Sequence, residues 1–352
     1  MFRKDIGIDL GTVNILVYIK GEGVVLNEPS VVVIDEDTKR PIAYGKDADE
    51  MLGRTPGKIR VIKPMKDGVI ADFETTGLLL DYLLRKVNIK GGFVKPRILI
   101  CCPANITEVE KSAIADAAAR TGAKRVFIEE EPKVAAIGAG LDISKPVANM
   151  VVDIGGGTTD IAVLSLGNIV TSASIKTAGN TFDNDIINYI KDKYKLLIGE
   201  KTAEKIKKNI GNVKYKEIKD NNNNGNKNKN NNDKKEHKKE EFEKMDVRGR
   251  DLVGGLPKTI TVSSNEIAEA LKSSVEKITK MVKQVLEQTP PELSADIIEK
   301  GIVLTGGGAL LKNLPEYLEE KLEVPVFTAE DPLTCVANGT GILLDKIHYI
   351  DY

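Results

Sequence analysis

Short apolar segments alternate with longer amphipathic ones along most of this chain. The short segments are rich in Ile, Val and Leu and are bounded by Gly, Asp, Asn or Pro, which is typical of buried β-strands. Strands that alternate with helices favour an α/β architecture. Strands are predicted at Ile6–Leu10, Ile15–Ile19, Ser30–Ile34, Ile98–Cys102, Met150–Ile154, Ile161–Leu166 and Ile302–Leu304.

Two capping boxes predict where helices begin. In such a box a Ser or Thr side chain and a Glu three residues later satisfy each other's backbone N–H groups. Thr107 and Glu110 form one box, ahead of an amphipathic segment that runs to Arg120. Ser263 and Glu266 form the other, ahead of a long amphipathic segment that Pro290-Pro291 should end.

One polar segment fits neither pattern. Residues Lys219–Glu241 contain no apolar side chain, and Asn221–Asn232 is almost entirely Asn and Lys. A segment with nothing to bury should be a disordered, solvated insertion. A role in tethering or interaction stays open.

Length and composition set broad limits on function. The chain has 352 residues, enough for two lobes or domains. Its formal net charge of -1 argues against a general nucleic-acid-binding protein, which needs a basic face to neutralise phosphates. The apolar fraction of 41% is typical of a soluble globular protein.

Cysteine and histidine are too scarce for several kinds of chemistry. The three cysteines include the adjacent pair Cys101 and Cys102, which we expect to be small buried residues of a strand rather than disulfide partners. With only His237 and His348, neither a His/Cys metal cluster nor a Ser–His–Asp triad is expected. The chain shows no signal peptide and no long apolar stretch, so we expect a cytoplasmic location.

A weak internal repeat carries the candidate chemistry. Asp5–Lys20 and Asn149–Leu166 each contain a strand, an Asp-x-Gly turn and a second strand. Turns of Gly and Thr direct several backbone N–H groups to one point, where they can bind phosphate oxygens. Asp9 and Asp153 end the first strands and would repel a bare phosphate, but they suit Mg²⁺ bound through water. The pair of turns therefore predicts a clamp for a Mg-polyphosphate.

A third glycine-rich turn follows the strand Ile302–Leu304. Gly306, Gly307 and Gly308 should connect that strand to a helix and allow a ligand to approach the backbone closely. The sequence has no GxxxxGK[ST] motif and no GxGxxG motif after a strand, so neither a P-loop nor a Rossmann dinucleotide site is expected.

With these three turns the chain resembles the actin, Hsp70 and sugar-kinase superfamily, and most closely the MreB family of bacterial actin homologues, in particular its Mbl (MreB-like) branch. The resemblance covers nearly the whole chain except the Asn/Lys tract. Segments similar to the family are Asp5–Asn14, Arg54–Gly57, Asp67–Asp72, Glu129–Gly140, Met150–Asp160, Arg248–Leu252, Gly255–Thr259 and Thr305–Leu311, and Lys95–Pro103 and Thr289–Ile298 resemble the Mbl branch.

The resemblance implies an actin-like, duplicated ribonuclease H-like fold of two lobes with a nucleotide cleft between them. The first lobe would span residues 1–145, with a small subdomain at about 30–75. The second would span residues 146–335, with a small subdomain at about 180–260 that contains the insertion at 219–241. Residues 336–352 would return to the first lobe.

The resemblance also implies roles for particular residues around ATP and Mg²⁺. Glu131 would orient or activate the attacking water, with Thr158 assisting, and Asp9 and Asp153 would hold Mg²⁺ through water. The phosphates and the nucleoside would lie against Thr12, Val13, Asn14, Gly155, Gly156, Gly157, Thr158, Glu204, Lys205, Ile206, Lys207, Gly306, Gly307, Gly308 and Ala309.

Members of this family are expected to hydrolyse ATP slowly and to polymerise into membrane-bound, antiparallel double filaments that guide peptidoglycan synthesis and maintain rod shape. Implied partners are further copies of the chain, the inner face of the cytoplasmic membrane, the cell-wall elongation machinery and MreB paralogues. Phe93 and Val94, bracketed by Lys90 and Lys95, form the candidate membrane loop.

One position departs from the family pattern, and three other functions stay open. Asn180 lies where relatives carry Asp in an AGD-type turn, although Asp183 is nearby. A metabolic kinase of the same superfamily would need a sugar pocket with a catalytic Asp, for which no candidate is apparent. An Hsp70-like chaperone would need a β-rich substrate domain, and a nucleotide-dependent regulator that never polymerises is the third alternative.

Overall fold

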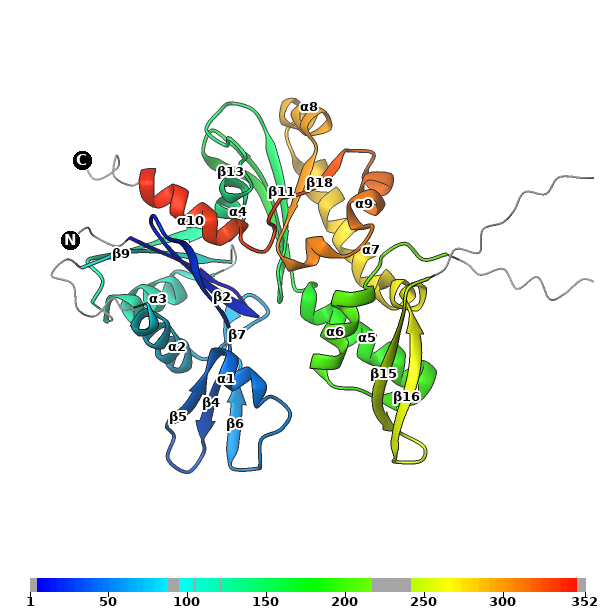
Figure 1. Ribbon diagram of the computed structural model, residues 1–352. Helices are drawn as coiled ribbons and strands as arrows, with labels where there is room; N and C mark the ends of the chain where they lie inside the picture. The colour runs from blue at the N-terminus through cyan, green and yellow to red at the C-terminus, as the bar shows by residue number, and fades with distance from the viewer. Residues whose placement is uncertain (1–4, 88–94, 104–105, 121, 217–241, 347–352) are drawn as a thin grey trace, which may run out of the picture. The chain divides into compact units, whose positions relative to one another are not determined.

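The computed structural model describes residues 5–87, 95–103, 106–120, 122–216 and 242–346. The chain divides into two compact units, whose segments can be located by residue number with the colour bar of Figure 1. Unit 1 comprises Met1–Phe182, Ser274–Leu310 and Pro315–Tyr352, and unit 2 comprises Asp183–Ser273 and Leu311–Leu314. Each unit has its own sheets and core and is described separately.

Unit 1 contains two five-stranded sheets of the same design. In each, a central strand pairs with an antiparallel partner on one side and a parallel strand on the other. The first sheet has the order β10-β9-β1-β2-β3, formed by Arg125–Glu130, Arg97–Cys102, Ile6–Leu10, Asn14–Ile19 and Gly23–Pro29. The second has the order β13-β12-β11-β17-β18, formed by Asn168–Ile175, Thr159–Ser165, Asn149–Ile154, Ile302–Thr305 and Val326–Thr328.

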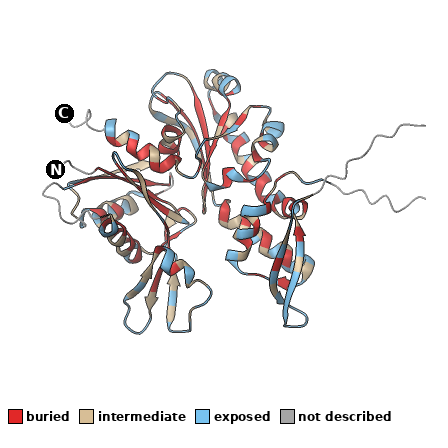
Figure 2. Ribbon diagram, viewed as in Figure 1, coloured by how far each residue is buried: buried red, intermediate tan, exposed pale blue. Residues whose placement is uncertain are grey.

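Helices cover both faces of the first sheet. One face packs on α2 (Phe73–Lys86) and α3 (Glu108–Arg120), in a core that includes Ile8, Leu80 and Ile114. Against the other face lie α4 (Glu131–Gly138) and α10 (Cys335–Lys346), which also pack on Val151 and Ala162 of the second sheet. Because apolar residues line both faces, the central strand β1 is buried along its whole length (Figure 2).

Smaller elements complete unit 1. A three-stranded sheet with the order β5-β4-β6 packs on the short helix α1, and the two-residue strands β7 and β8 form a hairpin. Their bounds, with those of the remaining helices, are Pro41–Tyr44 (β5), Val32–Asp35 (β4), Ile59–Ile62 (β6), Gly45–Glu50 (α1), Met65–Lys66 (β7), Val69–Ile70 (β8), Pro291–Lys300 (α8), Gly307–Leu310 (η1) and Leu314–Leu322 (α9).

Unit 2 is built from helices around a three-stranded sheet with the order β14-β15-β16. Two of its helices, α5 and α7, begin or end in unit 1, whereas α6 lies wholly within unit 2. The bounds are Gly179–Tyr194 (α5), Leu196–Leu197 (β14), Glu200–Ile210 (α6), Lys244–Asp251 (β15), Pro257–Ser263 (β16) and Ser264–Gln288 (α7).

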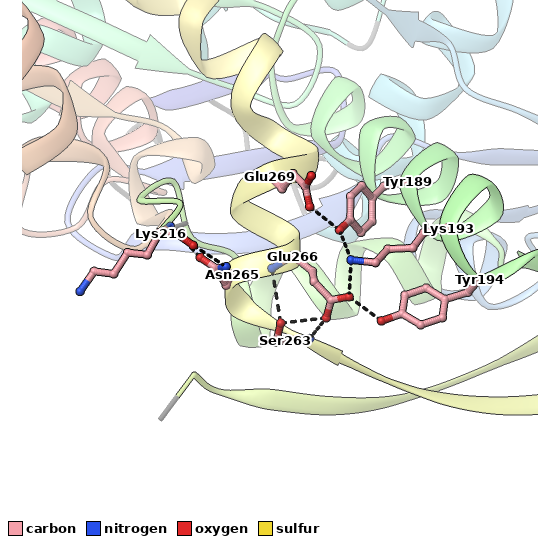
Figure 3. A network of polar contacts seen from close by, with 8 residues as sticks. All are labelled: Tyr189, Lys193, Tyr194, Lys216, Ser263, Asn265, Glu266 and Glu269. Carbon is pink, nitrogen blue, oxygen red and sulfur yellow. Dashed lines mark hydrogen bonds and ion pairs between the residues drawn. The ribbon is translucent and has the colours of Figure 1, made fainter. Parts of the chain in front are cut away.

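A polar network joins α5 to the beginning of α7 within unit 2 (Figure 3). Glu266 accepts hydrogen bonds from the Ser263 backbone N–H and hydroxyl, both at 2.8 Å, which completes the predicted capping box. The other Glu266 oxygen accepts a hydrogen bond from Tyr194 Oη at 2.5 Å and pairs with Lys193 Nζ at 2.9 Å. Lys193 also donates to Tyr189 Oη at 2.8 Å. One capping residue therefore also fastens the end of α5.

The predicted elements are all found, with shifts of a few residues at their ends. The Thr107–Glu110 capping box closes as expected, with Glu110 accepting from the Thr107 backbone N–H at 2.8 Å. Cys101 and Cys102 are buried in β9 as predicted. The third glycine turn differs from expectation, because it leads into the 3-10 helix η1, and the next α-helix begins only at Leu314.

Candidate functional site

The turn between β1 and β2 is a tight loop of Gly11, Thr12 and Val13. A side chain at Gly11 is excluded, because its Cβ would lie 2.4 Å from the Asn14 carbonyl oxygen. The Val13 carbonyl accepts a hydrogen bond from the Ser30 backbone N–H at 2.7 Å, which ties the loop to the segment after β3. The first predicted phosphate loop is thus held by its own backbone and that segment.

The turn between β11 and β12 is held from outside by the first residues of α5. The carbonyl oxygens of Gly155 and Gly156 accept hydrogen bonds from the backbone N–H groups of Gly179 and Asn180, at 3.1 and 2.8 Å. Asn180 therefore supports this loop through its main chain, which does not depend on the charge of its side chain. Thr158, at the end of the loop, is 8% exposed.

The two turns lie against one another in unit 1. A Cβ at Gly156 would lie 2.1 Å from Val13 Cγ2, and one at Gly157 would lie 2.7 Å from Thr12 Oγ1. Only glycine allows such close backbone approach. The fold therefore brings the two halves of the internal repeat together, as the predicted clamp requires.

A third turn contacts both of these hairpin turns, and the sequence motifs do not predict that it belongs to the site. Asp67 and Gly68 connect β7 to β8, and both have left-handed backbone angles, with φ of 50° and 73°. The Gly68 backbone N–H donates to Thr12 Oγ1 at 3.3 Å, and a Cβ at Gly68 would lie 2.5 Å from Thr158 Cγ2. The Asp-Gly dipeptide is a recognisable turn signal, but nothing local indicates what the turn contacts.

Four acidic residues gather beside these turns. Asp9 is the next-to-last residue of β1, Glu131 begins α4, and Asp153 and Asp160 lie opposite each other on β11 and β12. The three aspartates are at most 8% exposed, and Glu131 is partly buried. Glu131 shares a hydrogen bond with Asp153. Asp160 was not among the predicted site residues.

Burial of these carboxyl groups shifts their pKa values upward. Desolvation, reinforced by the charge of Asp153, raises the pKa of Asp9 to about 7. Desolvation raises the pKa of Asp153 to about 6, although a hydrogen bond from Thr305 opposes it. The pKa of Glu131 lies well above its usual range because of burial and the neighbouring aspartates. Such shifts mark an excess of buried negative charge.

This charge excess fits a divalent cation. No lysine or arginine is among the groups that set these pKa values within the described part of the chain. Over the same residues, no three His, Cys, Asp or Glu side chains are arranged to hold a metal ion directly. An ion here would therefore be held largely by water and by the ligand's own phosphates, as expected for Mg²⁺.

The triple-glycine turn is shaped by contact with β11. A Cβ at Gly306 would lie 2.7 Å from Asp153 Oδ1, and one at Gly308 would lie 2.2 Å from Ile154 Cγ2. Ala309 is buried, and a Cβ at Gly307 would meet only Leu333, at 3.2 Å. Two of the three glycines are thus needed for packing beside the carboxylates, whatever ligand the turn contacts.

The predicted adenosine residues of α6 lie in unit 2. Lys207 Nζ pairs with Asp183 Oδ2 at 2.8 Å, and Glu204 Oε1 pairs with Lys208 Nζ at 2.7 Å. Ile206 is fully buried and Lys205 is exposed. Of these four residues, Ile206 therefore exposes no surface in this structure.

The candidate membrane loop and the Asn/Lys tract lie outside the described residues. Phe93 and Val94 fall between residues 87 and 95, and the tract falls between residues 216 and 242. Over the residues that the structure describes, no helix is long and apolar enough to cross a membrane.

The structure contains two similar five-stranded sheets that pack on a shared pair of helices and carry Asp-x-Gly hairpins whose turns face each other. This arrangement defines an actin-like fold of the nucleotide-binding, ATPase type. The chain belongs to the MreB/Mbl family, whose model, described as MreB/Mbl protein, matches residues 3–231 and 227–351. The predicted family and fold class are thereby confirmed.

Individual relatives span almost the whole chain. It is 56% identical over 347 residues to the cell shape-determining protein Mbl of Bacillus subtilis (strain 168), covering 99% of this chain and 97% of that protein. It is 48% identical over 353 residues to the cell shape-determining protein MreB of Escherichia coli (strain K12), covering 99% and 95%. The crystal structure of MreB 5 of Spiroplasma citri bound to AMPPNP matches with a TM-score of 0.88 and 42% identity, covering 99% and 98%.

Proposed function

We propose that this chain binds ATP with Mg²⁺, hydrolyses it slowly, and assembles into membrane-associated filaments that help to determine cell shape. The observation that carries the proposal is the meeting of two glycine-rich hairpin turns with Asp9, Glu131 and Asp153 in unit 1. The naming of its relatives as cell shape-determining proteins, and the AMPPNP bound by MreB 5, support it.

The phosphates would lie between the two turns. Backbone N–H groups of Thr12–Asn14 and of Gly156 and Gly157 would donate to phosphate oxygens, and the Thr12 hydroxyl would add to them. The Gly155 backbone N–H donates to the Thr158 carbonyl at 2.9 Å, so Gly155 would contribute by closing the turn. Asp9 and Asp153 would hold Mg²⁺ through water, and the ion would neutralise phosphate charge during transfer. Their pKa values would fall once a cation balances the cluster.

Hydrolysis needs a positioned water more than covalent chemistry. Glu131 would accept a hydrogen bond from that water, with the Thr158 hydroxyl beside it. A carboxyl group whose pKa is raised by burial can accept a proton more readily than an exposed one, which suits a general base. The proposed nucleoside contacts are Glu204, Lys205, Ile206 and Lys207 of α6, together with Gly306–Ala309 of the third glycine-rich turn.

The assembly is proposed as an antiparallel double filament on the inner face of the cytoplasmic membrane, where it would direct the cell-wall elongation machinery. Phe93 and Val94 would insert shallowly between lipids. Burial of two such side chains contributes only about 3–5 kcal/mol, so a filament would bind through many weak contacts, and a monomer would bind poorly.

Pelleting with liposomes in ATP, imaged by electron microscopy, tests this proposal. We expect paired filaments on vesicles that contain anionic lipid. Replacing Phe93 and Val94 with Ser should abolish lipid association and leave ATP binding unchanged. ATP-bound monomers that never form filaments would instead indicate a regulator that does not polymerise.

A further inference from the structure

Asp153 is held by a hydroxyl group on the neighbouring strand. Thr305 Oγ1 donates a hydrogen bond to Asp153 Oδ1 at 2.8 Å, and both residues are almost completely buried. The parallel register of β11 and β17 pairs Asp153 directly with Thr305, so the two side chains project to the same face of the sheet.

The residue after Thr305 closes the space around the same carboxylate oxygen. Gly306 has a left-handed φ of 77°, and a Cβ there would lie 2.7 Å from Asp153 Oδ1 and 2.4 Å from the Ile154 carbonyl oxygen. One Asp153 oxygen is thus enclosed between a hydroxyl donor and a backbone turn. The carboxylate can therefore keep only a narrow range of orientations.

In the first half of the repeat, the residue paired with the aspartate has a different side chain. The parallel register of β1 and β9 pairs Asp9 with Cys101, so a buried thiol, which is a weak donor, lies where Thr305 lies beside Asp153. Within the described residues, no side chain donates a hydrogen bond to the Asp9 carboxylate. The two aspartates of the clamp therefore differ in how firmly they are held.

We propose that Thr305 is a positioning residue that fixes the Asp153 carboxylate for a water-bound Mg²⁺, whereas Asp9 is left to adjust. This inference rests on the proposed nucleotide function. Because one oxygen is fixed in advance, the Asp153 carboxylate loses less orientational freedom when the cation and its waters arrive. Thr305 itself touches neither nucleotide nor metal in this arrangement.

The test compares the affinity for a fluorescent ATP analogue in Mg²⁺ with the affinity in EDTA, for the wild type and for variants at Thr305. Thr305→Val keeps the shape and removes the donor, and it should reduce the Mg²⁺-dependent gain in affinity at least about tenfold, since hydrogen bonds to charged groups are among the stronger ones. Affinity in EDTA should change by less than about twofold. Thr305→Ser keeps the hydroxyl and should retain the gain to within about threefold.

Two further variants keep the test decisive. Thr305→Cys reproduces the residue found beside Asp9, and it should reduce the Mg²⁺-dependent gain in affinity as Thr305→Val does. It replaces Thr305→Val in the test if the valine variant folds poorly. Thr289→Val is the matched control, because Thr289 is another buried threonine in unit 1 whose hydroxyl donates to a backbone oxygen, that of Val285 at 2.7 Å. It should leave the Mg²⁺-dependent gain unchanged.

The outcomes distinguish a failure of the positioning role of Thr305 from a failure of the proposed nucleotide function. If the wild type shows no Mg²⁺-dependent gain, the proposed nucleotide function fails and the role of Thr305 fails with it. If the wild type shows the gain and Thr305→Val keeps it, or loses affinity equally in Mg²⁺ and EDTA, the positioning role alone is overturned.

Discussion

Gly156, in the turn of the second hairpin, lies directly against Val13, in the turn of the first. A β-carbon at position 156 would lie 2.1 Å from Val13 Cγ2 and 2.9 Å from Val13 Cβ. We predict that Gly156→Ala forces the two turns apart and weakens ATP binding by about 1–3 kcal/mol, the usual effect of overpacking a tight contact. Fluorescence titration with an ATP analogue measures this.

A double-mutant cycle identifies the contact as the cause. Val13→Ala removes the nearest clashing atom, so combining it with Gly156→Ala should recover part of the lost affinity. Gly57→Ala is the control, because a β-carbon there meets nothing within 4 Å. Additive losses in the double variant would show that the clash with Val13 is not what matters.

Glu131 is predicted to act in hydrolysis and not in binding. Its carboxyl group shares a hydrogen bond with Asp153 and lies among like charges, so replacing it removes negative charge beside the proposed phosphate site. Glu131→Ala should keep ATP affinity equal to or higher than wild type and slow phosphate release at least tenfold, in the range that general bases contribute. Phosphate release under single-turnover conditions measures this, and equal rates would refute the role.

The network around Glu266 predicts a pH-dependent contribution to the stability of unit 2. Desolvation acts to raise the pKa of Glu266, but hydrogen bonds from Tyr194, Lys193 and Ser263 outweigh it and lower the pKa to about 2. A carboxylate with a lowered pKa stabilises the folded state fully above its unfolded pKa, near 4.5. That contribution is lost as the pH falls toward 2.

Glu266→Gln should therefore destabilise unit 2 by about 1–3 kcal/mol at pH 7, and the difference from wild type should shrink below pH 4.5. Lys193 is 46% exposed, so most of this comes from the hydroxyl and backbone donors and little from the ion pair. Glu110→Gln, in the exposed capping box of α3, is the matched control and should have a smaller effect. Urea unfolding followed by tyrosine fluorescence is suitable, because the chain has no tryptophan.

The Asn/Lys tract is predicted to be dispensable for the fold. The Asn265 side chain forms two hydrogen bonds with the backbone of Lys216, at 2.8 and 3.0 Å (Figure 3). The Ser264 backbone N–H donates to the Glu243 carbonyl at 2.8 Å. The described residues on both sides of the tract are thus fastened to adjacent residues of α7. Deleting Asn221–Asn232 should leave the melting temperature nearly unchanged, since loop-closure entropy varies slowly with length. A large decrease would show that the tract packs on the fold.

Several features of the fold follow from local patterns, which act over a few residues. The capping boxes at Thr107 and Ser263 fix helix starts because both partners lie within one turn. The strands β1 and β11 are likewise predictable from the sequence, because each is a short apolar segment bounded by turn residues. The contact between Gly68 and Thr158 could not be predicted, because the residues are 90 positions apart (158 minus 68) and an Asp-Gly turn does not specify its neighbour.

The sequence by itself determined the repeated strand–Asp-x-Gly–strand hairpins, because their signals are local, and the actin-like family, because similar segments extend over nearly the whole chain. Only the tertiary structure decided that the turns at Val13 and Gly156 touch, that Asp160 joins the acidic cluster, and that Asp153 has a hydroxyl partner where Asp9 has a thiol. Strand register and sheet order set these pairings, and both depend on packing between segments far apart in the chain.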